Sequence, residues 1–297
     1  MTHTPVLLRE VLQMMSPAGA RVLVDCTVGL GGHAAALLEA AGEQARLIGL
    51  DVDEHNLRRA KENLARFGSR VRLFQANFEF LREVLVEAQA SSVDIILADL
   101  GVASTQLDDA ARGLSFMAAG PLDMRLDPRL TRTAADLVRE LPEKELADVI
   151  FAYGEERYSR RIARAIAAVR ATRRIETTTQ LAELVSSAVP AMARKARSGV
   201  HPATRTFQAL RIAVNDELGA LERSLAQWPG VLARGARAAV ISFHSLEDRR
   251  VKQAFAGWAR DGRAELLCKR PLTALADEIE SNPRSRSAKL RGLKWIA

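Results

Sequence analysis

The sequence predicts an α/β fold in which one mainly parallel sheet is interrupted by an all-helical insertion. Two observations carry this prediction. Over residues 21–98, short apolar runs alternate with segments of helical spacing, a pattern typical of parallel strands covered by helices on both faces. Between 107 and 209 no strand-like run occurs, and the alternation then returns at 236. Two sequential domains are the alternative, but they would not explain why the strand pattern resumes.

The strands of the first part are short apolar runs, most of which end in an aspartate. They are expected at 21–25, 47–50, 71–75 and 93–98. The helices between and after them are expected at 34–41, 54–67 and 78–90. Apolar strands of this kind are buried on both faces, and Gly42 and Gly68 stand where a glycine commonly ends a helix.

The insertion reads as helices separated by joints rich in Pro, Gly or Thr. Its helices are expected at 134–153, 157–169 and 178–192. After it come a helix at 214–228, a strand at 236–243, a helix at 247–258 and strands at 264–268 and 289–296. We therefore expect a discontinuous α/β domain, 1–106 with 210–297, and an inserted helical domain, 107–209.

Composition restricts the class of protein. The chain has 297 residues, of which 48% are hydrophobic and 27% charged, ordinary values for a globular protein. Cys26 and Cys268 are its two cysteines, too few for a disulfide framework or a four-thiolate zinc site. No apolar run approaches the ~20 residues that span a bilayer, and no signal peptide is recognisable. We expect a cytoplasmic protein with no membrane partner and no metal site.

Positive charge is concentrated in two blocks. The chain carries a formal net charge of +7, with +5 in 107–211 and +7 in 249–297 offset by acidic segments elsewhere. Arginine predominates, and it binds phosphate in a bidentate manner and stacks on bases. The clusters are Arg157/Arg160/Arg161/Arg164, Arg170/Arg173/Arg174, Arg194/Lys195/Arg197 and Arg284/Arg286/Lys289/Arg291/Lys294. Together they favour a nucleic-acid partner, although each cluster alone is equally compatible with a solvated surface.

The turn after the first strand has the composition of a nucleotide-binding loop. Residues 25–33 read DCTVGLGGH, and glycines there let the backbone approach a ligand in front of a helix N-terminus. The spacing of Gly29, Gly31 and Ala34 satisfies the dinucleotide fingerprint, and Asp51 follows at the distance of a ribose-binding acid. The alternative is a glycine turn that serves only strand–helix packing.

Acidic residues end three of the expected strands, at Asp25, Asp51 and Asp99. Ligands of open α/β sheets bind at this carboxyl edge. A cationic methyl donor, S-adenosyl-L-methionine, suits such an acidic rim better than a pyrophosphate does. Phe78 follows the third strand, where it is either an aromatic that stacks on adenine or a core residue at the start of a helix.

Ten segments spread along nearly the whole chain carry a family resemblance. They are 3–8 (HTPVLL), 29–33 (GLGGH), 99–104 (DLGVAS), 106–109 (QLDD), 112–116 (RGLSF), 120–125 (GPLDMR), 153–157 (YGEER), 201–208 (HPATRTFQ), 242–248 (SFHSLED) and 282–287 (NPRSRS). In this order they resemble the bacterial ribosomal RNA small subunit methyltransferase H family, also called MraW. Its members transfer a methyl group from S-adenosyl-L-methionine to the N4 amino group of one cytidine in the decoding centre of 16S rRNA.

The resemblance implies a Rossmann-like class I S-adenosylmethionine-dependent methyltransferase sheet with an inserted all-helical domain that recognises the substrate. It also implies a cofactor site formed by Gly31, Gly32, His33, Asp51, Phe78, Asp99 and Gln106. The implied partner is 16S rRNA within the small ribosomal subunit, while dimerisation through the insertion stays open. Ala103 departs from the family pattern, in which many relatives carry serine.

The expected chemistry needs an acceptor for the hydrogens of a weakly nucleophilic amino group. Enzymes that methylate amino groups of nucleic acids place a D/N-P-P-aromatic motif after the fourth strand, and this sequence has only its polar head, Asp99. The stacking aromatic must then be Phe116, Phe207 or Phe243. His244 is a second catalytic candidate, as a general base, with a structural hydrogen bond at the strand end as the alternative.

Four further residues are candidates for contact with the substrate: His201, Arg205, Ser242 and Ser245. For His201 and Arg205 a brace between domains is the alternative. Three other functions stay open at this point: a nicotinamide-dependent oxidoreductase, an RNA-binding assembly factor without activity, and a DNA amino-methyltransferase. The absence of prolines and an aromatic after Asp99 weakens the last.

Overall fold

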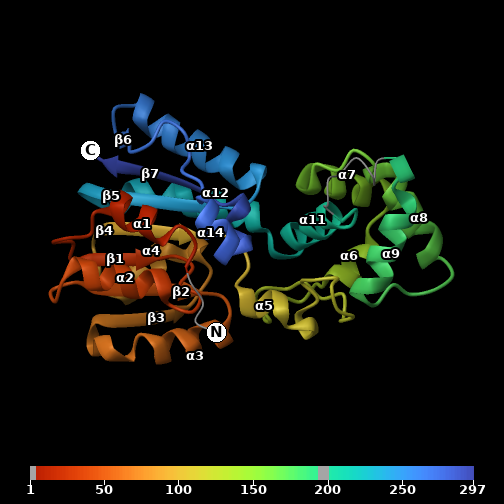
Figure 1. The fold of residues 1–297 in the computed structure, drawn as a ribbon, viewed down its shortest axis with the longest axis horizontal. Coiled ribbons are helices and arrows are strands. Elements are labelled where there is room, and N and C mark those ends of the chain that lie inside the picture. Colours follow the sequence, from red (N-terminus) through yellow and green to blue (C-terminus); the bar gives the residue numbers. More distant parts are fainter. Residues whose placement is uncertain (1–4, 193–200) are drawn as a thin grey trace. The chain divides into compact units, whose positions relative to one another are not determined.

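The computed structural model describes residues 5–192 and 201–297, and it divides the chain into two compact units. The first unit comprises 1–101 and 218–297, and the second comprises 102–217 (Figure 1). The basic cluster Arg194/Lys195/Arg197 lies outside the described residues. No helix in the described parts is long and apolar enough to cross a membrane.

A seven-stranded sheet forms the centre of the first unit. Its order is β3-β2-β1-β4-β5-β7-β6. The strands are β1 (Val22–Asp25), β2 (Arg46–Asp51), β3 (Val71–Gln75), β4 (Val93–Asp99), β5 (Leu232–Ser242), β6 (Ala264–Leu266) and β7 (Lys289–Trp295). The first five are parallel, as expected, whereas β7 runs antiparallel to both β5 and β6. The strand order reverses between β1 and β4, the place where open α/β sheets bind their ligands.

Helices cover both faces of the sheet because its central strands are apolar on both sides. Leu23, Leu47 and Leu97 belong to one core, with residues of α1 (Leu8–Met15), α2 (Gly32–Ala41) and α3 (Glu54–Asn63). Val24, Ile48 and Ile96 belong to the other core, with residues of α4 (Leu81–Glu87), α12 (Glu217–Gln227) and α13 (Ser245–Arg260). This alternation follows from the two-residue period of a strand and confirms the predicted layers.

Several elements of the first unit differ from the prediction. Helix α1, whose amphipathic residues Val11 and Met15 are buried, was not predicted, nor was α14 (Ala276–Ser281). The helix predicted at 214–228 is interrupted, because Asp216 adopts a left-handed conformation with φ 47° and α12 begins only after it. Strand β5 begins at Leu232, four residues before the predicted start.

The second unit is helical. It contains α5 (Ser104–Asp108), α6 (Ala134–Glu140), α7 (Glu143–Gly154), α8 (Ser159–Arg170), α9 (Thr178–Ala188) and α11 (Thr204–Asn215). In the described part of this unit, the β-pairing is one isolated bridge between Pro121 and Thr177, consistent with the expected absence of strands. The helix predicted at 134–153 is split before Pro142, and the one predicted to reach 192 ends at Ala188, two residues before Pro190.

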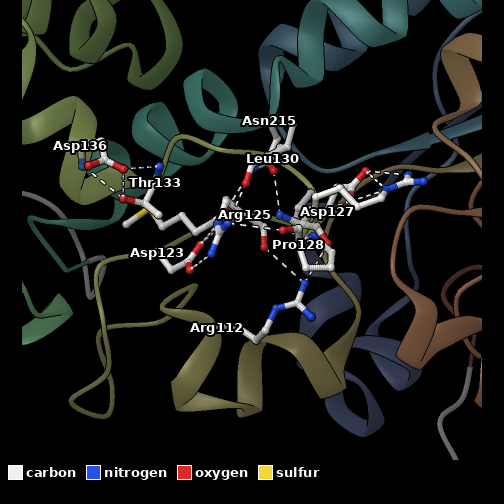
Figure 2. Close-up of polar contacts among 12 residues, drawn as sticks. Arg112, Asp123, Arg125, Asp127, Pro128, Leu130, Thr133, Asp136 and Asn215 are labelled. Atoms are coloured by element: carbon white, nitrogen blue, oxygen red, sulfur yellow. Dashed lines mark hydrogen bonds and ion pairs between the residues drawn. The ribbon is translucent and has the colours of Figure 1, made fainter.

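A polar network holds the long loop between α5 and α6 (Figure 2). The guanidinium of Arg125 donates to both carboxylate oxygens of Asp123 at 2.7 Å and to the Leu130 carbonyl at 2.6 Å. Arg112 donates to the carbonyls of Arg125 and Leu126. Asn215, at the end of α11, accepts from the Leu126 N–H and donates to the Met124 carbonyl. These bonds give Arg112, Asp123 and Arg125, which belong to the 112–116 and 120–125 motifs, a structural role in the loop.

Candidate functional site

Three aspartates converge at the carboxyl edge of the sheet, where β1, β2 and β4 lie side by side. Asp25 is in register with Gly49 of β2 and Leu97 of β4, so Asp51 and Asp99 each lie two residues further along. Burial is the main reason that the pKa of Asp25 is raised to about 7 and that of Asp51 to about 6. The edge is therefore an acidic site in a poorly solvated setting, which favours a cationic ligand.

The glycine turn between β1 and α2 combines a packing role with an open position. A Cβ on Gly32 would lie 2.5 Å from the Pro5 ring, and one on Gly31, whose φ is 85°, would lie 3.1 Å from Leu64. Packing therefore favours glycine at these two positions. This agrees with the alternative given for the turn, in which its glycines serve strand–helix packing. A Cβ on Gly29 would meet only the Thr27 carbonyl, at 3.8 Å, so the turn is open for backbone approach at Gly29.

Asp51 is held by three hydrogen bonds around the turn. Its Oδ2 accepts from the Gly29 N–H at 3.0 Å and from the Asn56 side chain at 3.2 Å, and its Oδ1 accepts from the Asp53 N–H at 2.8 Å. A carboxylate offers about four acceptor sites, two on each oxygen, so one site, on Oδ1, remains for a ribose hydroxyl. Asn56, which the sequence reasoning missed, is a buried polar residue on α3.

Asp99 ends β4 with a carboxylate that the described residues satisfy only in part. Its Oδ1 is buried and has no hydrogen-bond partner among the described residues. Its Oδ2 lies 3.5 Å from Nδ1 of His33, and the side chain is 24% exposed. Burial, with the charges of Asp25 and Glu247, raises the pKa of Asp99 well above its usual value. An unsatisfied acceptor at a ligand-binding edge is suited to an incoming N–H donor.

The ring nitrogen of His33 that faces away from Asp99 contacts the backbone. It is buried in the first turn of α2, and its Nε2 lies 2.8 Å from the Val6 carbonyl oxygen. The structure thus brings together His33, Asp99, Asp51, Gly31 and Gly32, all predicted cofactor residues, within the first unit.

Phe78 is half-buried and packs against the core that contains α4 and α12. It directly follows Asn77, whose Oδ1 accepts from the Glu79 N–H at 3.1 Å and so starts the short 3-10 turn that holds the ring. The structure therefore supports the interpretation of Phe78 as a core residue at the start of a helix. Part of the residue remains accessible.

The remaining polar candidates of the first unit mostly make structural bonds. Ser242 is buried, and its hydroxyl donates to the Lys289 carbonyl at 3.4 Å, which links β5 to β7. Nδ1 of His244 accepts from the Glu247 N–H at 3.4 Å and caps α13, while Nε2 lies 3.2 Å from the Glu247 carboxylate. Ser245 is exposed at the first position of α13.

Glu247 is a buried acid beside the site that the sequence reasoning did not single out. Its Oε2 accepts from the N–H groups of Phe243 at 2.8 Å and His244 at 3.3 Å. An acid three residues after a helix cap is the signature of a capping box, so the segment HSLE did contain the signal.

Gln106, His201 and Arg205 belong to the second unit. The buried Gln106 side chain accepts from the Ala103 N–H at 3.0 Å. The exposed ring of His201 stacks on Phe116 with centroids 4.6 Å apart, and Phe116 in turn meets Phe207 edge-on at 4.9 Å. Arg205 is exposed and donates to the Glu155 carbonyl.

A profile of the MraW methylase family matches residues 1–296. The chain belongs to the MraW methylase family. It is 49% identical over 306 residues to the Ribosomal RNA small subunit methyltransferase H of Symbiobacterium thermophilum, covering 98% of this chain and 96% of that one. The protein of the same name from Sorangium cellulosum is 50% identical over 296 residues, covering 99% and 91%. Membership confirms the resemblance inferred from the motifs and excludes a nicotinamide-dependent oxidoreductase.

The first unit has the Rossmann-like class I fold expected of an MraW methylase, and the cofactor of such a methylase is S-adenosyl-L-methionine. The residues present fit this group. The buried acidic edge, with Asp25 and Asp51, suits its cationic sulfonium and ammonium, and Asp51 would hold the ribose. When bound, the group supplies an electrophilic methyl carbon.

Proposed function

We propose that this MraW methylase transfers the methyl group of S-adenosyl-L-methionine directly to the exocyclic N4 amino group of a cytidine in the decoding centre of 16S rRNA. The relatives that match nearly the whole chain are named as small-subunit rRNA methyltransferases. The observation that carries the proposal for this chain is the buried Oδ1 of Asp99 at the end of β4, which has no hydrogen-bond partner in the part of the chain that the structure describes. Ribosomal RNA as substrate implies a cytoplasmic site of action.

The amino group of cytosine is a weak nucleophile, because its lone pair is delocalised into the ring. An acceptor that binds one amino hydrogen lets the nitrogen pyramidalise toward the methyl carbon. Asp99 is the acceptor in this proposal, and alignment of nitrogen, carbon and sulfur supplies much of the remaining acceleration. His244 is the weaker catalytic candidate, because its Nδ1 is engaged as the cap of α13.

Phe243 is the best-supported of the three candidates for the stacking aromatic. Its ring lies against Gly101, two residues after Asp99, where a Cβ would come within 3.2 Å of the ring. Gly101 has a φ of 118°, a conformation that favours glycine. The half-buried Phe243 would thus stack on the target base. It would replace the motif aromatic that this sequence lacks after Asp99.

The second unit is proposed to bind the RNA around the target. Arg157, Arg160, Arg161 and Arg164 are all exposed and are spaced to share one side of α8 and its N-terminal approach; we call them the α8 arginine ridge. His201 and Arg205 are proposed to add base and phosphate contacts. Drawing a cytidine out of folded RNA costs a few kcal/mol, which such contacts would offset.

Transfer of radiolabelled methyl tests the proposal. The substrates are small ribosomal subunits that lack the modification, naked 16S rRNA and duplex DNA, each followed by nucleoside analysis. We expect N4-methylcytidine from ribosomal substrate and none from DNA.

Asp99→Ala, which removes the acceptor, should lower the rate at least about a hundredfold. Label on RNA with an unimpaired Asp99→Ala variant would refute the role of Asp99, and cofactor binding with no label anywhere would favour an RNA-binding factor.

A further inference from the structure

The hydrogen bond at Nε2 of His33 determines which ring nitrogen carries a proton. A backbone carbonyl can only accept, so the 2.8 Å contact with the Val6 oxygen requires a hydrogen on Nε2. Neutral His33 therefore presents the lone pair of Nδ1 on the other side of the ring. That nitrogen lies 3.5 Å from Oδ2 of Asp99.

Two acceptors that face each other are unfavourable without a proton between them. An ionised Asp99 opposite a neutral His33 is such an arrangement. One additional proton relieves it, either as a carboxylic acid that donates to Nδ1 or as an imidazolium that donates to the carboxylate. The geometry therefore describes a pair that binds one proton jointly, while Oδ1 of Asp99 stays unpartnered among the described residues and is left for another donor.

We propose that His33 and Asp99 form a proton-sharing pair that takes up the proton released by the target amino group. This proposal rests on the proposed function and assigns its proton acceptor. Asp99 is the catalytic residue, because in the proposed function it contacts the amino group, and His33 is a positioning residue that acts through Asp99.

The step balances in atoms and charge. The nitrogen–carbon bond forms, the carbon–sulfur bond breaks with its electron pair left on sulfur, and the amino N–H bond breaks with its proton passing to the Asp99 carboxylate. The pair must begin without the shared proton, and a cationic donor at the acidic edge favours that state. After transfer sulfur is neutral, and the proton has neutralised the negative charge of the pair.

The charged groups around Asp99 set how firmly the proton is held. Asp25 on β1 and Glu247 on α13 are both acidic and both strengthen its retention. His33 on α2 faces Oδ2, and His244 lies beside Glu247 and partly offsets that charge when it is protonated. Asp25 and Glu247 carry negative charge, whereas the His33 imidazole is neutral. The edge therefore retains a proton after turnover.

The first test observes the pair in the cofactor-free, full-length protein by NMR of ¹⁵N-labelled histidine. We expect His33 in the tautomer with hydrogen on Nε2 and a titrating Nδ1. Asp99→Asn should lower the His33 midpoint by about one pH unit or more, because the amide cannot carry the negative charge that stabilises an imidazolium. An unchanged His33 titration in Asp99→Asn would overturn the proposal.

The second test separates positioning from mere packing. His33→Gln keeps a donor for the Val6 carbonyl but removes the group opposite Asp99. At saturating cofactor we expect unchanged thermal stability, a single-turnover rate at least about tenfold lower, and an acidic limb of the rate–pH profile displaced to lower pH. Full activity with an unshifted profile would mean that His33 only anchors Val6. If the wild-type protein methylated no substrate, the proposed function would fail while the NMR result stayed interpretable.

Discussion

At the scale of single residues, the site contains aspartates whose ionisation is unfavourable. Asp25, Asp51 and Asp99 have raised pKa values chiefly because they are buried. A polar or charged group in such a place lowers the stability of the folded chain, and residues that break a folding rule in this way are concentrated at functional sites. The carboxylates therefore mark the edge of the sheet as a binding site on energetic grounds.

Asp25→Asn should stabilise the cofactor-free protein at alkaline pH. The folded pKa of about 7 exceeds an unfolded value of about 3.9, so unfolding releases a proton between these values and stability falls as pH rises through that window. The amide keeps the acceptor for the Thr27 N–H and removes the buried charge. We expect a gain of up to ~4 kcal/mol at pH 8 and little gain at pH 4, measured by urea unfolding. A loss of stability at pH 8 would contradict this.

Gly101→Ala should disturb the aromatic next to Asp99. The residue must adopt φ 118°, and its Cβ would press on Phe243 at 3.2 Å. Gly42→Ala is the matched control, since its φ of 97° is equally strained but no atom lies within 4 Å of the added Cβ. Both should lose about 1–3 kcal/mol in thermal unfolding, but only Gly101→Ala should also lower methyl transfer. Equal effects on transfer would argue against Phe243.

At the scale of elements, the start of α13 organises the end of β5. Glu247 accepts the N–H groups of Phe243 and His244, and His244 returns a bond to the Glu247 N–H. This reciprocal cap fixes the chain between strand and helix. It fixes the backbone at Phe243 and positions the Glu247 charge, which adds to the effect of burial in raising the pKa of Asp99.

His244→Asn distinguishes capping from proton transfer. Asparagine is among the best residues at a helix N-cap, so unfolding free energy should stay within about 0.5 kcal/mol of wild type and methyl transfer within a few-fold. His244→Leu is the control without an acceptor and should lose about 1 kcal/mol. A hundredfold loss of transfer in a stable His244→Asn protein would instead make His244 the base.

At the scale of the whole molecule, only part of the excess positive charge is exposed and able to bind RNA. Arg291 lies in the basic cluster near the C-terminus, yet its side chain is 12% exposed and forms two bonds with Asp248 at 2.6 and 3.2 Å. The α8 arginine ridge is exposed throughout. Exposed arginines can release counterions from RNA, whereas a buried ion pair cannot, so the ridge is the stronger candidate for RNA binding.

Neutralising the ridge should weaken RNA binding without affecting the cofactor. For Arg157→Gln/Arg160→Gln/Arg161→Gln we expect a lower affinity for the small subunit and a salt dependence whose slope falls by ~0.7–0.9 for each phosphate that the variant no longer neutralises. The control is Arg58→Gln/Arg59→Gln/Lys61→Gln on exposed positions of α3, which should bind as wild type. Filter binding at several salt concentrations measures both. Equal slopes for the two triple variants would exclude the ridge.

The sequence predicted the sheet well, because buried parallel strands are short apolar runs that few other elements imitate. Its errors occurred where tertiary contacts decide the outcome. The direction of β7 depends on its insertion between β5 and β6, and the left-handed Asp216 that separates α11 from α12 has no strong local signal. Likewise Asp99 was predictable from its place after a strand, but its contact with His33 joins residues from distant parts of the chain.

The pairing of β4 with β5 has a consequence for how the protein is made. Val93 lies opposite Leu232, so the partner of β4 leaves the ribosome on the order of ten seconds later, at ~5–20 residues per second. During that interval β4 is an unprotected edge strand of apolar sequence, a template for unwanted pairing with other nascent chains. Translation that slows within 102–217 would lengthen this exposure, and chaperone demand should therefore rise with rare codons in the insertion, far from any residue of the sheet.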